Sequence, residues 1–253
     1  ILQDLLEGDS QVLVEGEALL KPAWIQGVVV QVWSPDSDRI YFLKTSAGVT
    51  TLNTVDVVTG EVQEMDLTPY TSLSQPSINV NHRLALIASA PTISPRVISL
   101  EDGEVTIHQR STSEAIPPQD LPTPYEIQWT SSDGETVYGI YSPPTSSRYE
   151  GKGLPPAIVL IHGGPTSSVN IGYNLEAVFF TSRGYGYLEV NYRGSTGFGR
   201  GYREALRGNW GNLDVIDAAG GAQALVDQSL ADPDSLVIKG GSAGGYTVLN
   251  ALI

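Results

Sequence analysis

The 253-residue chain carries 14 basic and 28 acidic side chains, a formal net charge of −14 at pH 7. An acidic surface repels phosphate backbones, so nucleic acid is excluded as an expected partner. The chain has no cysteine, which excludes disulfides, cysteine-ligated metals and a thiol nucleophile. The net charge is −10 over residues 1–125 and −4 over residues 126–253. A solvated acidic face and a patch that attracts a cationic peptide N-terminus are alternative explanations of this excess.

No apolar run approaches the roughly 18 residues of a membrane span, so no membrane partner is expected. No cofactor or metal motif is found. The chain begins with Ile1 and shows no signal peptide, so we expect the true N-terminus to lie elsewhere. The absence of cysteine weakly favours a cytoplasmic location, and the oligomeric state is not readable from the sequence.

Residues 1–120 read as short β-strands rich in β-branched and aromatic residues, separated by turn signals. The expected strands are 27–34, 39–45, 51–58, 83–90 and 96–102. A strand–turn–strand pattern returns after about 40 residues, a period that suits four-stranded β-propeller blades. We expect about three C-terminal blades of a propeller here, with a β-sandwich as the alternative.

The proline-rich stretch 111–124 is extended and predicts the crossing between two domains, 1–120 and 121–253. Strands and helices then alternate, which predicts a mostly parallel, doubly wound sheet with both faces covered. The expected elements are a hairpin turning at Asp133-Gly134, strand 157–161, helix 172–183, strand 185–191, loop 192–199, helix 214–228 and strand 236–240.

The expected helix 214–228 has one predicted apolar face, made by Val215, Ala219, Ala222 and Val226. Asp214 is expected to cap this helix. Asp217 and Asp227 are expected to add surface charge rather than to join a catalytic triad.

A G-x-S-x-G motif occurs as Gly240-Gly241-Ser242-Ala243-Gly244, between an expected strand and an expected helix. This context predicts a nucleophile elbow, in which a sharp strand-to-helix turn exposes the serine hydroxyl and needs small neighbours. A plain glycine-rich turn and a phosphate loop are the alternatives. The P-loop pattern requires Lys-Ser/Thr after its last glycine, whereas Tyr246 follows Gly245 here. A dinucleotide fingerprint prefers an early strand.

The segment His162-Gly163-Gly164-Pro165 follows the expected strand 157–161. A tetrahedral intermediate needs two N–H donors, one from the residue after the nucleophile and one from a glycine-rich loop after an earlier strand. We therefore predict an oxyanion hole made by the backbone N–H groups of Gly164 and Ala243. His162 is expected to brace this loop by hydrogen bonds, and a tight turn is the alternative explanation.

The motifs HGGP, VNYRGSTGFGRGY and DPDSLVIKGGSAGGY together resemble the prolyl oligopeptidase family of serine peptidases, in its acylaminoacyl-peptidase and dipeptidyl-aminopeptidase-like branch. The likeness is strong over residues 120–253 and loose before them. It implies an α/β-hydrolase domain gated by a β-propeller and acting on short peptides. In some branches of the family, a tyrosine hydroxyl of the first loop donates a hydrogen bond to the oxyanion. His162 occupies the position of that tyrosine here, so the resemblance favours the backbone N–H of Gly164 as the donor.

A serine nucleophile needs a histidine base and an orienting carboxylate. In α/β-hydrolases these follow the serine along the chain, but no His, Asp or Glu follows Ser242. Of the three histidines, His162 is assigned to the oxyanion loop, and His82 and His108 fall in the β-rich region. The sequence is therefore interpreted as a fragment truncated at both ends, inactive as given, with β-strand 235–239 left as an open sheet edge.

Three functions remain open for the full-length protein. The first is a serine peptidase that releases aminoacyl, dipeptidyl or acylaminoacyl groups through an ester on Ser242. The second is a carboxylesterase on the same scaffold. The third is a non-catalytic binding protein built on a hydrolase fold. The preceding β-rich region favours the peptidase.

Overall fold

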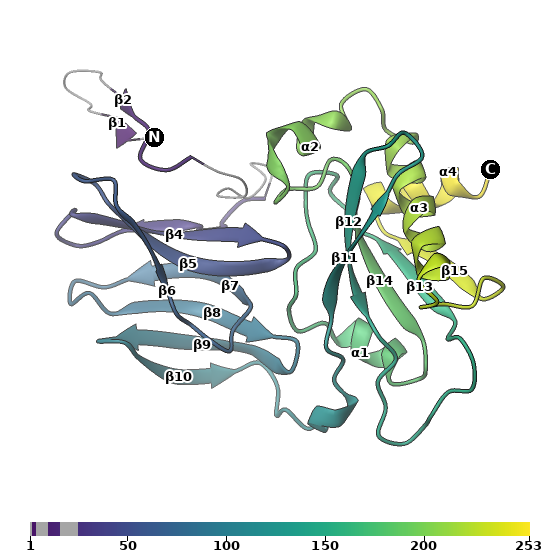
Figure 1. Ribbon diagram of the computed structural model, residues 1–253. Helices are drawn as coiled ribbons and strands as arrows, with labels where there is room; N and C mark the ends of the chain where they lie inside the picture. Colours follow the sequence, from purple (N-terminus) through teal and green to yellow (C-terminus); the bar gives the residue numbers. More distant parts are fainter. Residues whose placement is uncertain (1, 4–9, 16–24) are drawn as a thin grey trace.

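The computed structural model describes residues 2–3, 10–15 and 25–253. Figure 1 shows antiparallel sheets formed by the N-terminal half beside a sheet with helices formed by the C-terminal half. The N-terminal half contains two four-stranded antiparallel sheets, with strand orders β3-β4-β5-β6 and β10-β9-β8-β7, and a two-stranded pair, β1-β2. Their bounds are β1 Leu2–Gln3, β2 Ser10–Gln11, β3 Gln31–Trp33, β4 Arg39–Ser46, β5 Val49–Asp56, β6 Val62–Met65, β7 Ser72–Ile78, β8 Leu84–Ala90, β9 Ile93–Glu101 and β10 Glu104–Arg110.

A single apolar cluster joins the two four-stranded sheets. Leu52 of β5, Leu84 and Leu86 of β8 and Ile98 of β9 are at most 2% exposed and belong to it. Successive side chains of a strand point to opposite faces, so these residues share the face of each strand that fills this core.

All five expected strands of this half contain an observed strand, but β6, β7 and β10 were not predicted. Each of the three lies at the edge of its sheet. Edge strands bury one flank less, and β6 and β10 are largely exposed along their length, so they carry little apolar signal. Part of the expected third blade falls on residues 1, 4–9 and 16–24, outside the described residues.

The C-terminal half contains a five-stranded sheet with the order β11-β12-β14-β13-β15. Strands β13, β14 and β15 are parallel, and the hairpin β11–β12 adds an antiparallel edge. The predicted hairpin and the three predicted strands are confirmed. The bounds are β11 Tyr125–Thr130, β12 Thr136–Ser142, β13 Ala157–Ile161, α1 Leu175–Thr181, β14 Gly186–Asn191, α2 Gly199–Ala205, α3 Leu213–Asp227, β15 Leu236–Gly240 and α4 Ala243–Ala251; a short 3₁₀ turn spans Pro118–Asp120.

Helices cover both faces of this sheet, as predicted (Figure 1). Helix α1 packs on one face, where Ala177 meets Ile158 of β13 and Tyr187 of β14. Helices α3 and α4 lie on the other face, over a core that includes Leu188 of β14 and Leu225 of α3. Because β13 pairs in parallel with both β14 and β15, the C-terminal ends of these three strands lie along one edge of the sheet. Ligands of open α/β sheets bind at that edge.

The predicted apolar face of α3 is wrong. Ala219 is exposed, and the buried face is Asp214, Asp217, Ala218, Gly221, Ala224 and Leu225. A Cβ on Gly220 or Gly221 would lie 2.9 Å from the Trp129 ring. The indole thus occupies the space that the missing side chains leave, and an apolar pattern cannot register a glycine as a packing position. Helix α2, which begins at the last residue of the expected loop 192–199, was also not predicted.

The two halves touch through the segment 165–174, which follows the HGGP motif. The Ile171 N–H donates to the Gly48 carbonyl at 2.7 Å. The Thr71 hydroxyl donates to the Ile171 carbonyl at 2.6 Å. A Cβ on Gly172 would lie 3.2 Å from that of Ser72. The backbone of this segment is therefore held by the turn between β4 and β5 and by the residues at the start of β7.

Candidate active site

Ser242 stands between β15 and α4, at the C-terminal edge of the parallel strands. It is the residue before the first turn of α4 and has φ 54° and ψ −122°. A non-glycine residue with positive φ is strained, and such strain concentrates at functional sites. The Ser242 residue is exposed. The chain thus presents this serine to solvent on a sharp strand-to-helix bend, which is the geometry of a nucleophile elbow.

The glycines at the two ends of the motif have no room for a side chain. A Cβ on Gly240 would lie 2.5 Å from the Gly244 carbonyl oxygen, and a Cβ on Gly244 would lie 2.1 Å from the Ile161 carbonyl oxygen. A Cβ on Gly241 would have no neighbouring heavy atom within 4 Å. The elbow therefore requires glycine at positions 240 and 244, where backbone segments touch, because α4 starts directly against the end of β13.

The HGGP segment lies against this elbow. A Cβ on Gly163 would lie 3.0 Å from the Gly241 carbonyl oxygen and 3.3 Å from the Ser242 Cβ. Gly164 has φ +57°, and its carbonyl accepts a hydrogen bond from the Ser167 N–H at 2.7 Å. The N–H of Ala243 opens α4, and the first N–H groups of a helix have no intrahelical partner. The structure thus brings Gly163 of the HGGP segment against Gly241 and Ser242 of the elbow, and Gly244 against the backbone of His162.

His162 is buried beneath the loop and stacks on Tyr192, with 4.5 Å between ring centroids and 20° between planes. Its Nε2 lies 2.8 Å from the Ser195 Oγ, and its Nδ1 lies 3.0 Å from the Gly163 carbonyl oxygen. Burial lowers the pKa of His162 to about 4, so the ring is neutral near pH 7. Both ring nitrogens are engaged, which is the bracing contact expected of this residue.

The loop 192–199 is anchored by a buried ion pair that the sequence analysis missed. The Arg193 guanidinium bonds to Asp217 of α3 at 2.6 Å and to Asp133 of the hairpin at 2.5 Å, and the Arg193 N–H donates to Asp217 at 2.8 Å. Burial alone would lower the pKa of Arg193, but these two carboxylates outweigh it and hold that pKa above its usual range. Loop 192–199 in turn supports His162 through Ser195.

The expectations for Asp214 and Asp217 are wrong, because Asp214 does not cap α3 and Asp217 does not lie on the surface. Asp217 is 0% exposed and Asp214 is 4% exposed. Asp214 accepts hydrogen bonds from the Thr247 hydroxyl of α4 and from the Gly211 N–H, while Asn212 is the residue that precedes α3. Asp214 therefore ties α3 to α4, the helix that follows Ser242. A polar residue two positions after an apolar strand, as in VNYR, was the only sequence signal for Arg193.

The described part of the chain supplies no histidine base for Ser242. His82 faces Asp36 at 3.7 Å, and His108 bonds to Ser99 at 2.8 Å, both within the antiparallel sheets. Among the described residues there is also no cluster of three His, Cys, Asp or Glu side chains that could hold a metal. No described helix has the length and apolar character to cross a membrane.

The parallel sheet, the strained serine at the end of β15 and the glycine loop after β13 define an α/β-hydrolase fold. The model of the prolyl oligopeptidase family matches residues 171–253. The acylamino-acid-releasing enzyme of Mus musculus is 30% identical over 233 residues, which is 85% of this chain and 30% of that protein. Dipeptidyl aminopeptidase BIII of Pseudoxanthomonas mexicana is 35% identical over 135 residues, 51% of this chain and 19% of that protein.

Solved structures agree with this family. A puromycin-hydrolyzing peptidase of Mycobacterium tuberculosis superimposes with a TM-score of 0.89 at 37% identity, covering 97% of this chain and 39% of that one. A puromycin hydrolase gives a TM-score of 0.91 at 33% identity, covering 99% and 38%. The chain belongs to the prolyl oligopeptidase family of serine peptidases. It spans less than two fifths of the length of each of these four relatives.

Proposed function

We propose that the full-length protein is a serine peptidase that cleaves short peptides through an acyl-enzyme on Ser242. The observation that carries the proposal is the exposed, strained Ser242 packed against Gly163 of the HGGP loop. The peptidases among its relatives, named for releasing acylamino acids or dipeptides, support peptides as the substrate class.

In the proposed mechanism the Ser242 Oγ attacks the carbonyl carbon of the scissile bond. The negative charge that develops on the carbonyl oxygen is stabilised by the N–H groups of Gly164 and Ala243 and by the positive N-terminal end of α4. Collapse of this intermediate expels the amine and leaves an ester on Ser242, which water then hydrolyses. His162 acts only by holding the loop, because its ring is buried, neutral and bonded at both nitrogens.

The base and its orienting carboxylate are proposed to come from residues of the full-length protein outside this chain. Removing the base of a serine peptidase costs about a millionfold in turnover. We therefore propose that the 253-residue chain by itself shows no useful hydrolysis. Measurable Ser242-dependent turnover of an aminoacyl amide by the isolated chain would contradict this.

The two four-stranded antiparallel sheets are proposed to be blades of a β-propeller that gates the site. Each sheet runs up and down in sequence order, as the strands of a blade do. A structure of the full-length protein should show further four-stranded sheets around the same axis; a closed two-sheet sandwich would refute the propeller.

A fluorophosphonate probe tests the nucleophile in the full-length protein. We expect labelling of the wild type and none of Ser242→Ala, with Ser167→Ala, a serine of the neighbouring loop, as the matched control that stays labelled. Labelling that survives Ser242→Ala, or none in the wild type, would favour the non-catalytic alternative. Aminoacyl amides and p-nitrophenyl esters then separate the remaining two: turnover of esters alone would favour the carboxylesterase.

A further inference from the structure

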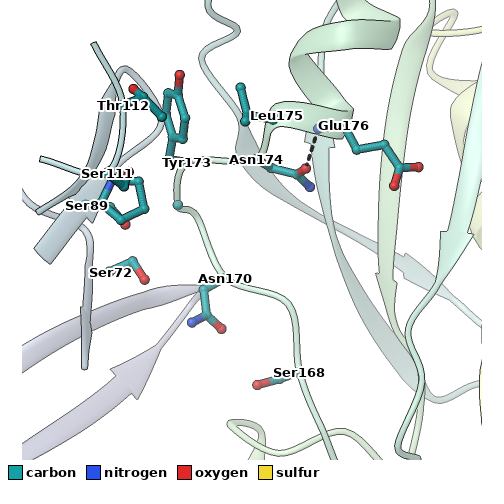
Figure 2. A pocket seen from close by; sticks show the side chains of 12 residues that line it. Ser72, Ser89, Ser111, Thr112, Ser168, Asn170, Tyr173, Asn174, Leu175 and Glu176 are labelled. Atoms are coloured by element: carbon teal, nitrogen blue, oxygen red, sulfur yellow. Dashed lines mark hydrogen bonds between the residues drawn. The ribbon is translucent and has the colours of Figure 1, made fainter. Parts of the chain in front are cut away.

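A small cavity lies beside α1, at the segment that joins the two halves. It has about 10 Å³ of space for water-sized groups, which is room for roughly one such group. Its lining includes Glu189 of β14, Asn170 and Pro91. It adjoins a groove of about 720 Å³, with which it shares Asn170, Gly172 and Asn174. Figure 2 shows this groove between Ser72 and Ser89 of the antiparallel sheets and Asn174 and Leu175 of α1.

Glu189 is 8% exposed, and within the described part of the chain its carboxyl group accepts one hydrogen bond, from the Asn174 Nδ2 at 3.1 Å. Within the described residues it has no Lys, Arg or His partner. The Oδ1 atom of Asn170 is buried and also has no hydrogen-bond partner. The same cavity is therefore lined by two groups that accept hydrogen bonds and need a donor, and one of them is a carboxyl group without a counter-ion.

The charges around the cavity favour a cation. Among the described residues, Glu189 is the one charged residue that lines the cavity, and Glu176 is the one that lines the groove. Glu176 is paired with Lys239 and accepts from the Tyr187 hydroxyl. Burial, with a smaller effect of the Glu176 charge, raises the pKa of Glu189 to about 7. A neutral water would satisfy Asn170 but would leave the Glu189 charge uncompensated when it ionises.

We propose that this cavity binds a primary ammonium group, with Glu189 and the Asn170 Oδ1 as its acceptors. An ammonium group has the three donors, the positive charge and the size that these oxygens and this volume require. We assign it to the protonated N-terminus of a peptide, whose following residues extend along the hydroxyl-lined groove. The choice of a peptide as the carrier rests on the proposed function; the binding of an ammonium group does not.

Isothermal titration calorimetry on the full-length protein with Ser242→Ala tests the proposal without hydrolysis. The probes are triglycine, N-acetyltriglycine and methylammonium. We expect triglycine to bind at least tenfold more tightly than N-acetyltriglycine. Glu189→Gln should remove this preference by weakening triglycine alone at least tenfold. Glu204→Gln, which removes an exposed carboxylate of α2 that is not among the residues lining the cavity or the groove, should change neither affinity.

Methylammonium separates the two sources of the ammonium group. Glu189-dependent binding of methylammonium shows that any primary amine suffices, and binding of triglycine alone shows that the peptide is required; either result supports the site. Equal affinities for the free and acetylated peptides, no binding of either, or the same triglycine affinity in wild type and Glu189→Gln would overturn it. If Glu189→Gln does not fold, Asn170→Leu should weaken triglycine severalfold and leave N-acetyltriglycine unchanged.

A proton count gives a second readout. At pH 7 a fraction of Glu189 is protonated, and a bound cation favours the ionised form. Triglycine binding should therefore release a fraction of a proton per site in the wild type and none in Glu189→Gln, as measured in buffers of different ionisation enthalpy. Peptidase activity that fails in the wild type while Glu189-dependent triglycine binding persists would refute the proposed function and leave this inference standing.

Discussion

Replacing Gly244 by alanine tests the packing that creates the elbow. The new Cβ would lie 2.1 Å from the Ile161 carbonyl oxygen and 2.9 Å from that of His162. Both are backbone atoms at the end of a central strand, so neither can move aside by a rotamer change. Overpacking of this kind costs about 1–3 kcal/mol, and the higher end is expected because the strand itself must shift.

Gly245→Ala is the matched control, one residue further along the same helix. Its Cβ would meet only the Gly240 carbonyl oxygen, at 3.5 Å, so the helix-forming preference of alanine should stabilise it by about 0.5–1 kcal/mol. The two variants should differ by about 3–4 kcal/mol. At a urea dependence of about 3 kcal/mol/M, their unfolding midpoints should lie about 1 M apart. Equal midpoints would show that the elbow is not as tightly packed as argued.

Three further predictions concern the groups that hold the site. Asp217→Asn leaves the buried Arg193 charge without its main partner and should cost about 3–5 kcal/mol of unfolding free energy, whereas Arg200→Gln, in an exposed pair, should cost under about 1 kcal/mol; similar costs would refute the role of the buried pair. The pKa of His162 is lowered to about 4 in the folded state, below the ordinary value of about 6.5, so the unfolded chain binds a proton first and stability should fall as pH drops from 6.5 towards 4. Urea midpoints at pH 7 and pH 5 should show this fall, and a His162→Gln variant with an undiminished fall would contradict it. Ser242→Gly should be about 1 kcal/mol more stable than Ser242→Ala, because only glycine relieves a φ of 54°; equal thermal midpoints would argue against strain at the elbow.

The local features of the site were readable from the sequence because they depend on neighbouring residues. An apolar strand followed by glycines around Ser242 predicts a strand–turn–helix, and the structure contains β15, the bend and α4 in those places. The apolar segment 157–161 likewise predicts a strand followed by the HGGP loop, and the structure contains β13 and that loop in those places. In these cases the residues that form the feature are also the residues that carry the signal.

Contacts between segments that are far apart in the sequence could not be predicted from it. Arg193 and Asp217 are 24 residues apart, and Asp133 is 60 residues from Arg193, so no spacing rule predicts that the three meet. The buried face of α3 was mispredicted because Trp129, from a different strand, fills the space over Gly220 and Gly221. The unpredicted strands β6, β7 and β10 take their hydrogen bonds from central neighbours and need little apolar character of their own.

The sequence by itself determined the local geometry of the elbow: where the bend falls, which positions must be small and which loop lies against it. The tertiary structure decided the burial of the acidic residues. Asp214 was expected to cap α3 and Asp217 was expected to add surface charge, yet both carboxylates lie inside. Glu189 lies within an apolar strand and has no cationic partner among the described residues. The physical reason is that the electrostatic environment of a carboxylate is set by what packs over it, and those neighbours come from other parts of the chain.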